Sequence, residues 1–349
     1  MSTTHGRVSL SLAVIGILTT LASAAAMAQS DREKQLYDAA KKEGEFTWYT
    51  AHYDQALATR IGNAFTQKYP GVQANVIKAT AQVTYQRLLQ DIKAGQIQSD
   101  VFSSTDVSHF VQLKQNGNLE KFVPENQAKI VEAFRNADPD GFYTLTWVGL
   151  VAVSYNTTKV KAADAPKSWT ELLDPKWTGQ IASGNPNFSG SVGVWTVALN
   201  KLYGWDWFTK LNGLKPQVGR SIDDGVTMLN AGERMLAIAD PSTTMRNAAK
   251  GNPLAVSYPT DGAVAVVGPS GVIKGSKSPN AGKLFIEFLL SAEGVKVIAE
   301  NYEQSLRPDV PPPAGAKALS EVKTVSPTAE DITKELPVVR EKWKETFGL

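Results

Sequence analysis

Short apolar runs typical of β-strands alternate along the chain with segments whose apolar residues recur at helical spacing. Short apolar runs of strand character occupy residues 46–49, 72–77 and 101–102, and segments with apolar residues at helical spacing separate them. A second series of the same kind covers residues 180–239. Strands that alternate with helices of this length favour right-handed crossover connections on a mainly parallel sheet. The pattern therefore predicts an α/β fold.

Two further apolar runs, residues 150–154 and 263–267, are candidates for extended strands that cross between two lobes. An amphipathic helix is predicted over residues 281–289, and a C-terminal helix carries Val339, Trp343 and Phe347. We assign residues 29–149 and 263–300 to lobe 1, and residues 150–262 and 301–349 to lobe 2. The two crossovers would form a hinge.

The N-terminus has the order of charge, apolar core and small residues that is typical of a secretory signal peptide. Arg7 precedes an apolar run over residues 8–21, and Ala26-Met27-Ala28 predicts cleavage after Ala28. The apolar run is shorter than the ~20 residues of a membrane span. Cleavage would leave roughly 320 residues, more than one hydrophobic core usually organises, which again indicates two lobes.

Composition and charge exclude several classes of function. The chain has 36 basic and 34 acidic residues, a formal net charge of +2, and no cysteine. This balance argues against a nucleic-acid partner, which needs a basic stripe. No nucleophile elbow surrounds Ser103, His52 or Asp106, and no metal-ligand spacing is present. We therefore predict a protein that is not an enzyme and needs no cofactor or metal.

The candidate chemistry lies in the loops that follow the predicted strands. Ligands of open α/β sheets bind outside the carboxyl ends of the strands, and here those ends are rich in hydroxyl groups. Any single loop can be explained as a helix cap or a turn, but five such loops indicate a cleft lined by neutral donors. The candidate ligand-binding residues are Thr50, His52, Tyr53, Ser103, Ser104, Thr105, Ser189, Gly190, Ser191, Thr243, Thr244 and Tyr258.

Ser189-Gly190-Ser191 is the most informative of these segments because it directly precedes a helical run. The first turn of a helix has free N–H groups and a partial positive charge, which together attract anions. The alternative interpretation is an ordinary N-cap that stabilises only its own helix.

Several phrases of the chain resemble one family. They are VAVSYNTTKV at 151–160, APKSWTELLDPKWTGQI at 165–181, SKSPNAGKLFIEFLLSAEGVKVIAE at 276–300 and SLRPDV at 305–310. They resemble the periplasmic solute-binding proteins of ATP-binding-cassette (ABC) importers, in the group related to ferric-iron-binding and phosphonate- or sugar-phosphate-binding proteins. The resemblance implies a two-lobed periplasmic-binding-protein fold of type II, a membrane permease as partner, and a monomer in the periplasm.

The sequence departs from the ferric-binding members of this group at their metal ligands. The adjacent tyrosine pair expected there is replaced by Pro241-Ser242, and the expected carboxylate falls at Thr105, next to Asp106. The anion-anchoring Ser-Gly element is retained at Ser189. We therefore expect a small organic anion as ligand: a phosphonate, a phosphate ester or a carboxylate. Two alternatives stay open: a ferric site using His52, Tyr53, Asp106 and Tyr258 with a synergistic anion, and an exported hydrolase.

Overall fold

The computed structural model describes Met1 and residues 30–349. The predicted signal peptide and its cleavage after Ala28 lie outside the described residues. Within the described part, no helix is long and apolar enough to cross a membrane.

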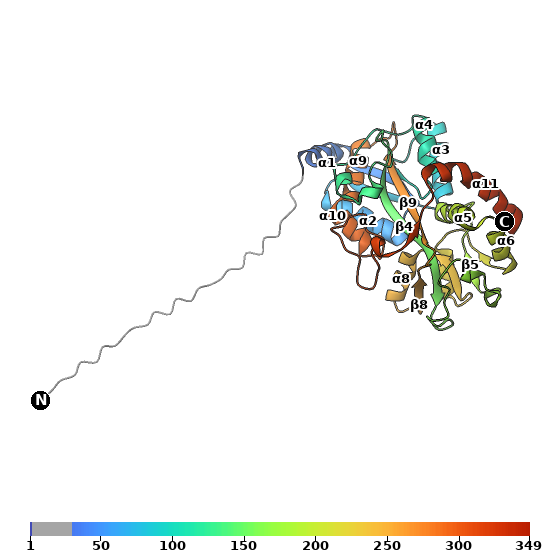
Figure 1. Ribbon diagram of the computed structural model, residues 1–349. Helices are drawn as coiled ribbons and strands as arrows, with labels where there is room; N and C mark the ends of the chain where they lie inside the picture. The colour runs from blue at the N-terminus through green and yellow to red at the C-terminus, as the bar shows by residue number, and fades with distance from the viewer. Residues whose placement is uncertain (2–29) are drawn as a thin grey trace.

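Lobe 1 is built on three parallel strands in the order β2-β1-β3. The predicted α/β alternation is confirmed here, since each strand leads into a helix (Figure 1). The strands are β1 (Glu45–Thr50), β2 (Gln73–Lys78) and β3 (Val101–Ser103), and the helices are α1 (Asp31–Glu43), α2 (Gln55–Lys68), α3 (Ala81–Lys93), α4 (Val107–Gln115), α9 (Pro279–Leu290) and α10 (Ala292–Ala299).

Lobe 2 repeats the arrangement with the parallel order β7-β5-β6. Its strands are β5 (Ile181–Ser183), β6 (Gln217–Val218), β7 (Leu236–Ala239) and β8 (Leu254–Ser257), and its helices are α5 (Gly190–Tyr203), α6 (Asp206–Gly213), α7 (Asp224–Asn230) and α8 (Pro241–Ala249). A short strand, β10 (Thr324–Val325), and the C-terminal helix α11 (Ala329–Phe347) follow.

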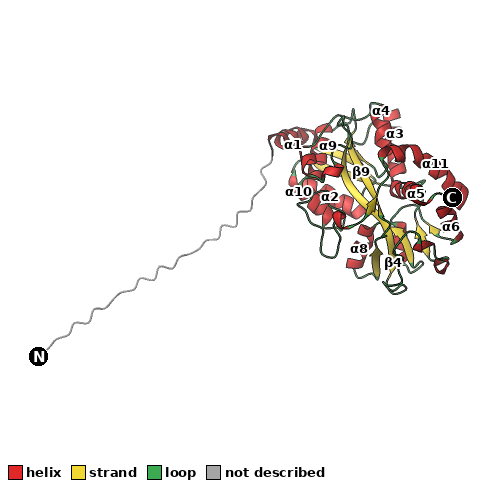
Figure 2. Cartoon of the chain, viewed as in Figure 1, coloured by secondary structure: helices red, strands yellow, loops and turns green. Residues whose placement is uncertain are grey.

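Two long strands join the lobes, β4 (Thr144–Asn156) and β9 (Ala263–Val272). They pair with each other in antiparallel register, β9 also pairs with β3, and β4 also pairs with β7 and β8. Figure 2 shows both strands running through the middle of the molecule. The predicted crossovers are confirmed as strands, and both are longer than the sequence pattern indicated. The fold is the predicted two-lobed α/β type.

Aromatic side chains fill the core of each lobe. In lobe 1 the Phe285 ring of α9 lies 4.9 Å from the Phe46 ring and 4.8 Å from the Trp48 ring. In lobe 2 the Trp195 ring of α5 meets the Phe208 ring edge-on at 5.4 Å. All of these side chains are buried. Each lobe thus carries a rigid core that supports the loops at its strand ends.

The C-terminal tail contacts both lobes. Leu306 accepts a hydrogen bond from Val131 N–H at 2.9 Å and shares a small apolar cluster with Val148 and Leu290. Further along, α11 packs on α5 and on α4. The lobe boundaries stay a prediction, and the two halves of the tail differ in their neighbours.

Candidate functional site

Four helices begin at the carboxyl ends of β1, β3, β5 and β7, where the two lobes face each other. Three of them, α2, α4 and α8, start with an aspartate N-cap: Asp54, Asp106 and Asp240. Each carboxylate accepts a hydrogen bond from its own first turn and compensates the helix dipole there. Only α5, of these four, begins with a neutral cap, Ser189. The first turn of α5 is therefore the best of the four for an external anion.

The first turn of α5 also has free donors. The Ser189 hydroxyl accepts a hydrogen bond from Val192 N–H at 3.4 Å. Among the described residues, the N–H groups of Gly190 and Ser191 have no hydrogen-bond acceptor. Two buried N–H groups beside an uncompensated helix dipole are suited to bind one anionic oxygen or two.

Gly190 of lobe 2 lies directly against Thr105 of lobe 1. A Cβ atom at position 190 would come within 2.5 Å of Thr105 Oγ1 and 2.8 Å of the Thr105 carbonyl carbon, much closer than real contacts allow. The loops after β3 and before α5 thus face each other with no room for a side chain. The structure brings together these two of the predicted loops.

Most of the other predicted hydroxyl groups already have partners inside the protein. Thr50 accepts from His52 N–H, Ser103 from the Trp48 indole, and Ser104 from Asp106 N–H, while Thr244 bonds to Ser154 and to the Asp240 carbonyl. These groups hold the strand ends in place. Within the described chain, the hydroxyls of Thr105 and Ser191 have no such partner, so both can contact a ligand.

Asp106, beside Thr105, belongs to an ion-pair network. Its carboxylate lies 3.1 Å from the Arg340 guanidinium and 3.4 Å from His109 Nε2. Burial by itself would raise the pKa of Asp106, but the neighbouring His109 ring, the Arg340 charge and the hydrogen bonds from Ser108 outweigh it, so the pKa lies below its usual value. Arg340 also donates to the Pro186 carbonyl at 2.9 Å, so α11 links the loops of both lobes.

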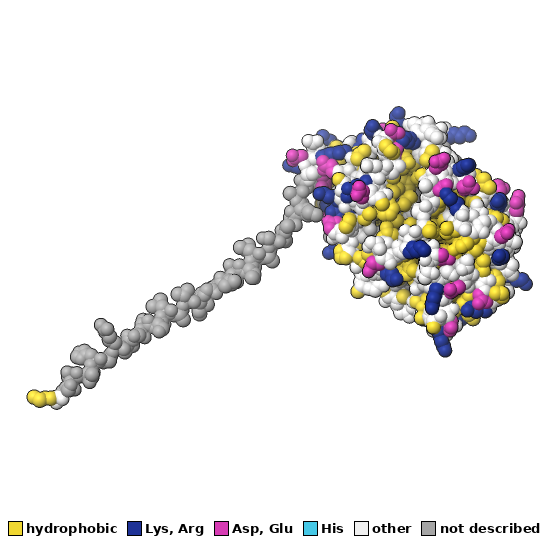
Figure 3. Space-filling view, viewed as in Figure 1, with side chains coloured by type: hydrophobic (Ala, Val, Ile, Leu, Met, Phe, Trp, Pro, Cys, Tyr) yellow, Lys and Arg dark blue, Asp and Glu magenta, His cyan; other side chains and the backbone are white. Residues whose placement is uncertain are grey.

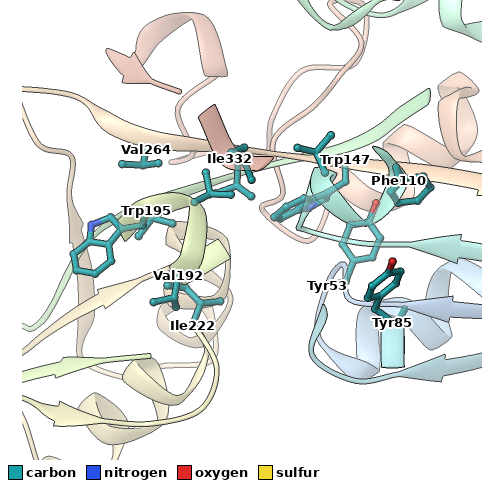
Figure 4. Packing of buried hydrophobic residues seen from close by; sticks show 14 of the residues in the cluster. Tyr53, Tyr85, Phe110, Trp147, Val192, Trp195, Ile222, Val264 and Ile332 are labelled. Carbon is teal, nitrogen blue, oxygen red and sulfur yellow. The ribbon is translucent and has the colours of Figure 1, made fainter. Parts of the chain in front are cut away.

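Tyr53 lies against Trp147 of β4 (Figure 4). The His52 ring lies beside both of these rings. The His52 ring stacks on the indole at 5.2 Å, and its Nε2 lies 3.1 Å from the Ser104 carbonyl. Burial lowers the pKa of His52 to about 4, so the imidazole is neutral at pH 7. Gly268 and Gly149 of the two crossover strands leave space for these rings, because a side chain at either position would overlap them.

Two polar atoms of this aromatic group have no hydrogen-bond partner among the described residues: His52 Nδ1 and Tyr53 Oη. Both side chains are buried, at 0% and 6% exposure. Tyr53 also has a left-handed backbone, with φ of 61°. Strained residues and unsatisfied buried groups are concentrated at functional sites.

An ion-pair cluster around Arg246 lies beside these rings. The Arg246 guanidinium contacts Glu303 at 2.7 Å and Asp54 of lobe 1 at 3.1 Å, and it donates to Thr243 Oγ1 at 2.9 Å. Glu303 also accepts from the Trp147 indole at 3.0 Å. Arg246 was absent from the sequence prediction, although Asp240 followed by Pro241 signals a helix start that places Thr243 and Arg246 one turn apart.

Tyr258 lies on a different wall of lobe 2. Its hydroxyl is 3.9 Å from Met245 Sδ, and Lys317 lies over its ring at 5.2 Å. Tyr258 and Lys317 line a cavity of about 490 Å³, together with Val256, Ser257 and Gly315. Burial, with a contribution from the Asp240 charge, raises the pKa of Tyr258 to about 12, so its hydroxyl is neutral at pH 7.

The surface between the lobes is mostly apolar in the view of Figure 3. Hydrophobic side chains gather in a strip between the α2 side and the α5–α11 side, and charged side chains surround it. Specificity at such a surface depends on a small number of polar groups, as in most ligand sites.

Comparison with known proteins identifies the scaffold. The family model for bacterial extracellular solute-binding proteins matches residues 98–335. The chain belongs to this family. A putative 2-aminoethylphosphonate-binding periplasmic protein of Salmonella typhimurium is 24% identical over 317 residues, covering 86% of this chain and 88% of that protein.

Solved structures share the fold of this solute-binding protein. The periplasmic binding protein AfuA from Actinobacillus pleuropneumoniae, with fructose-6-phosphate bound, matches with a TM-score of 0.79 and 21% identity over 88% of this chain and 99% of that one. Iron-bound HitA from Pseudomonas aeruginosa matches with a TM-score of 0.74 and 22% identity over 85% and 98%. The predicted resemblance and the type II fold are confirmed. The protein is a periplasmic solute-binding protein of the ABC-transporter type.

Proposed function

We propose that this protein captures a small organic anion, a phosphonate, phosphate ester or carboxylate, between its two lobes. The anionic group lies beside the contact of Gly190 with Thr105, within reach of the free N–H groups at the start of α5 and of the Thr105 hydroxyl. The loaded monomer delivers it to the membrane permease of an ABC importer. Export with cleavage after Ala28 belongs to the same proposal. The observation that carries it is the contact of Gly190 with Thr105, because it joins an uncompensated helix start of one lobe to a free hydroxyl of the other.

Two of the proteins that resemble this chain favour an anion as the ligand, and iron-bound HitA, which shares the fold, favours the ferric alternative. The Salmonella relative is named for a phosphonate, and AfuA holds a sugar phosphate. A thermal-shift screen of phosphonates, phosphate esters and carboxylates tests the proposal, because a ligand that binds only the folded state raises the unfolding temperature. Calorimetric titration then gives the affinity of each ligand that scores. No shift with any of these anions would contradict the proposal.

The Ser189 hydroxyl should make a modest contribution to binding. We expect Ser189→Ala to weaken binding of the ligand found in the screen by about tenfold, since one hydrogen bond to a charged group is lost while the backbone donors remain. Ser291→Ala is the matched control: Ser291 caps α10 in the same way, accepting from Gly294 N–H at 3.0 Å. Both variants lose a cap, but only Ser189→Ala should lose affinity. Equal titration curves for the two variants would assign Ser189 to capping alone.

A ferric site is the second candidate, favoured by the free His52 Nδ1 and Tyr53 Oη. The rest of the donor set fits poorly: Asp106 pairs with Arg340, and the described residues contain no group of three His, Cys, Asp or Glu side chains suited to a metal. We expect no visible tyrosinate absorption with ferric citrate. A coloured complex that is lost in Tyr53→Phe or Tyr258→Phe would reverse this preference.

The hydrolase alternative has less support. The family and the relatives named above are solute-binding proteins. Turnover on a panel of phosphate and carboxylate esters, absent from a Ser103→Ala variant, would establish it.

A further inference from the structure

Two arginines on the lobe 2 side reach across to lobe 1. Arg246 of α8 lies 3.1 Å from the Asp54 carboxylate, and Arg340 of α11 lies 3.1 Å from the Asp106 carboxylate. Asp54 and Asp106 are the N-caps of the lobe 1 helices α2 and α4. In both carboxylates Oδ1 accepts from the first turn of its own helix, while Oδ2 contacts the arginine of the other lobe. Each N-cap aspartate is therefore also a contact between the lobes.

Arg340 is attached to lobe 2 through the helix that carries it. α11 packs on α5 and α6, and near its end Thr346 accepts hydrogen bonds from Trp205 at 2.9 Å and from Asn212 at 2.7 Å. Toward lobe 1, the bond from Arg340 to Asp106 is the one side-chain hydrogen bond that α11 makes among the described residues. When the lobes separate, α11 stays with lobe 2 and this bond breaks.

Arg246 has two further acceptors on the lobe 1 side. It donates to the Glu303 carboxylate at 2.7 Å and to the Asn301 carbonyl at 2.9 Å. Both residues are tied to lobe 1, since Glu303 also accepts from the Trp147 indole and the Asn301 side chain accepts from Arg60 at 3.4 Å. The Arg246 side chain is 10% exposed, so water competes little for these bonds. Opening of the lobes would break them together.

The helices around the two arginines leave space between the lobes. A cavity of about 390 Å³ lies between α2 and α8, where it is lined by Ala56, Arg246 and Ala249. A second cavity, of about 350 Å³, lies between α4 and α11 and is lined by Val111 and Thr333. Side chains that line a void lose the dispersion contacts of complete packing. The charged contacts therefore account for a larger share of the attraction between the lobes at these two places.

We propose that Arg246 and Arg340 are positioning residues, which hold the two lobes closed through the N-cap aspartates of α2 and α4. Neither arginine has to contact the ligand. A ligand that binds only the closed state has an apparent affinity that falls with the fraction of closed protein, so these residues set affinity through the position of the lobes. The inference rests on the proposed function only in that closure captures the ligand.

Pairs of introduced cysteines measure closure without any ligand, because the chain has no cysteine of its own. Ala56→Cys with Ala249→Cys spans α2 and α8, and Val111→Cys with Thr333→Cys spans α4 and α11. Each pair lines one cavity between the lobes, so a short bifunctional thiol reagent joins it faster when the lobes are closed. The rate of cross-linking therefore reports the closed fraction.

Each ion pair is removed on one side of the molecule and its effect is measured on the other, which excludes a purely local change. We expect Arg340→Gln to slow cross-linking between α2 and α8 about tenfold, since a charged hydrogen bond is lost. Asp54→Asn should slow cross-linking between α4 and α11 about threefold, because the Asp54 side chain is 35% exposed. Its amide oxygen still caps α2.

Lys201→Gln is the matched control. Lys201 pairs with Asp331 of α11 at 2.6 Å, but α5 and α11 lie on the same side of the hinge, so both cross-linking rates should stay unchanged. A thermal unfolding scan verifies that all variants fold. An unchanged rate in Arg340→Gln or in Asp54→Asn would overturn the role of the arginine concerned, and equal slowing by Lys201→Gln would overturn both. No ligand is added, so these outcomes are independent of whether the proposed anion binds.

Discussion

Gly190→Asp is expected to abolish ligand binding, with a loss of affinity of more than a hundredfold, about 2.7 kcal/mol. Two effects act in the same direction. The new carboxylate occupies the positive end of α5 that the anion needs, and its Cβ overlaps Thr105, which keeps the lobes apart. The fold should persist, because an acidic residue in the first turn of a helix is favourable. Calorimetric titration with the ligand from the screen measures the loss.

Gly190→Asn separates the two effects, since its side chain has the same size and no charge. Both variants should fail to close, so small-angle scattering should show no ligand-dependent decrease in radius of gyration, in contrast to the unmodified protein. If Gly190→Asp loses more affinity than Gly190→Asn, the difference measures the effect of the added negative charge on ligand binding. Normal binding by Gly190→Asp would show that the start of α5 is only a cap.

Arg246→Met is expected to destabilise the protein by about 3–5 kcal/mol, because it leaves the buried Glu303 and Asp240 carboxylates without their cation. Chemical denaturation at pH 7.5 measures this loss. Arg60→Met is the matched control: Arg60 lines the same cavity, but its pair with Glu300 at 3.1 Å is about half exposed. Exposed pairs contribute about 0–1 kcal/mol. Equal losses for the two variants would contradict the importance of the buried cluster.

The Arg246→Met deficit should also depend on pH. Burial raises the pKa of both Asp240 and Glu303. The Glu303 charge raises the pKa of Asp240 further, and the Asp223 charge raises both. A carboxyl group with a higher pKa in the folded state binds more protons when folded, so stability falls as pH rises from the unfolded pKa through the folded one. Without the guanidinium this effect grows. We expect Arg246→Met to lower the free energy of unfolding less at pH 5 than at pH 8. Adding Glu303→Gln to Arg246→Met should also reduce the loss. A loss that is the same at both pH values would contradict this prediction.

Local sequence determined most of the secondary structure. The alternation of short apolar runs with helical spacing predicted β1, β2, β3, β5 and β7, because strand and helix periods are properties of a few consecutive side chains. The Ser189-Gly190 helix start was predictable for the same reason. The start of α8 at Pro241 was readable too, since Asp before Pro marks a helix N-terminus, but the segment was interpreted as a hydroxyl-rich loop.

Tertiary structure decided which of these residues are free to bind. The hydroxyls of Ser103 and Thr244 looked equivalent to that of Thr105 in the sequence, yet their strand neighbours use them as hydrogen-bond partners. Glu303 and Arg246 meet across 57 positions of the chain, and no local pattern encodes such a pair. By itself the sequence determined the α/β elements, the family resemblance and the helix start of α5. The approach of Thr105 to Gly190 and the charged cluster arise only because the tertiary fold brings the strand ends of the two lobes face to face. Burial then fixes which polar groups lack a partner.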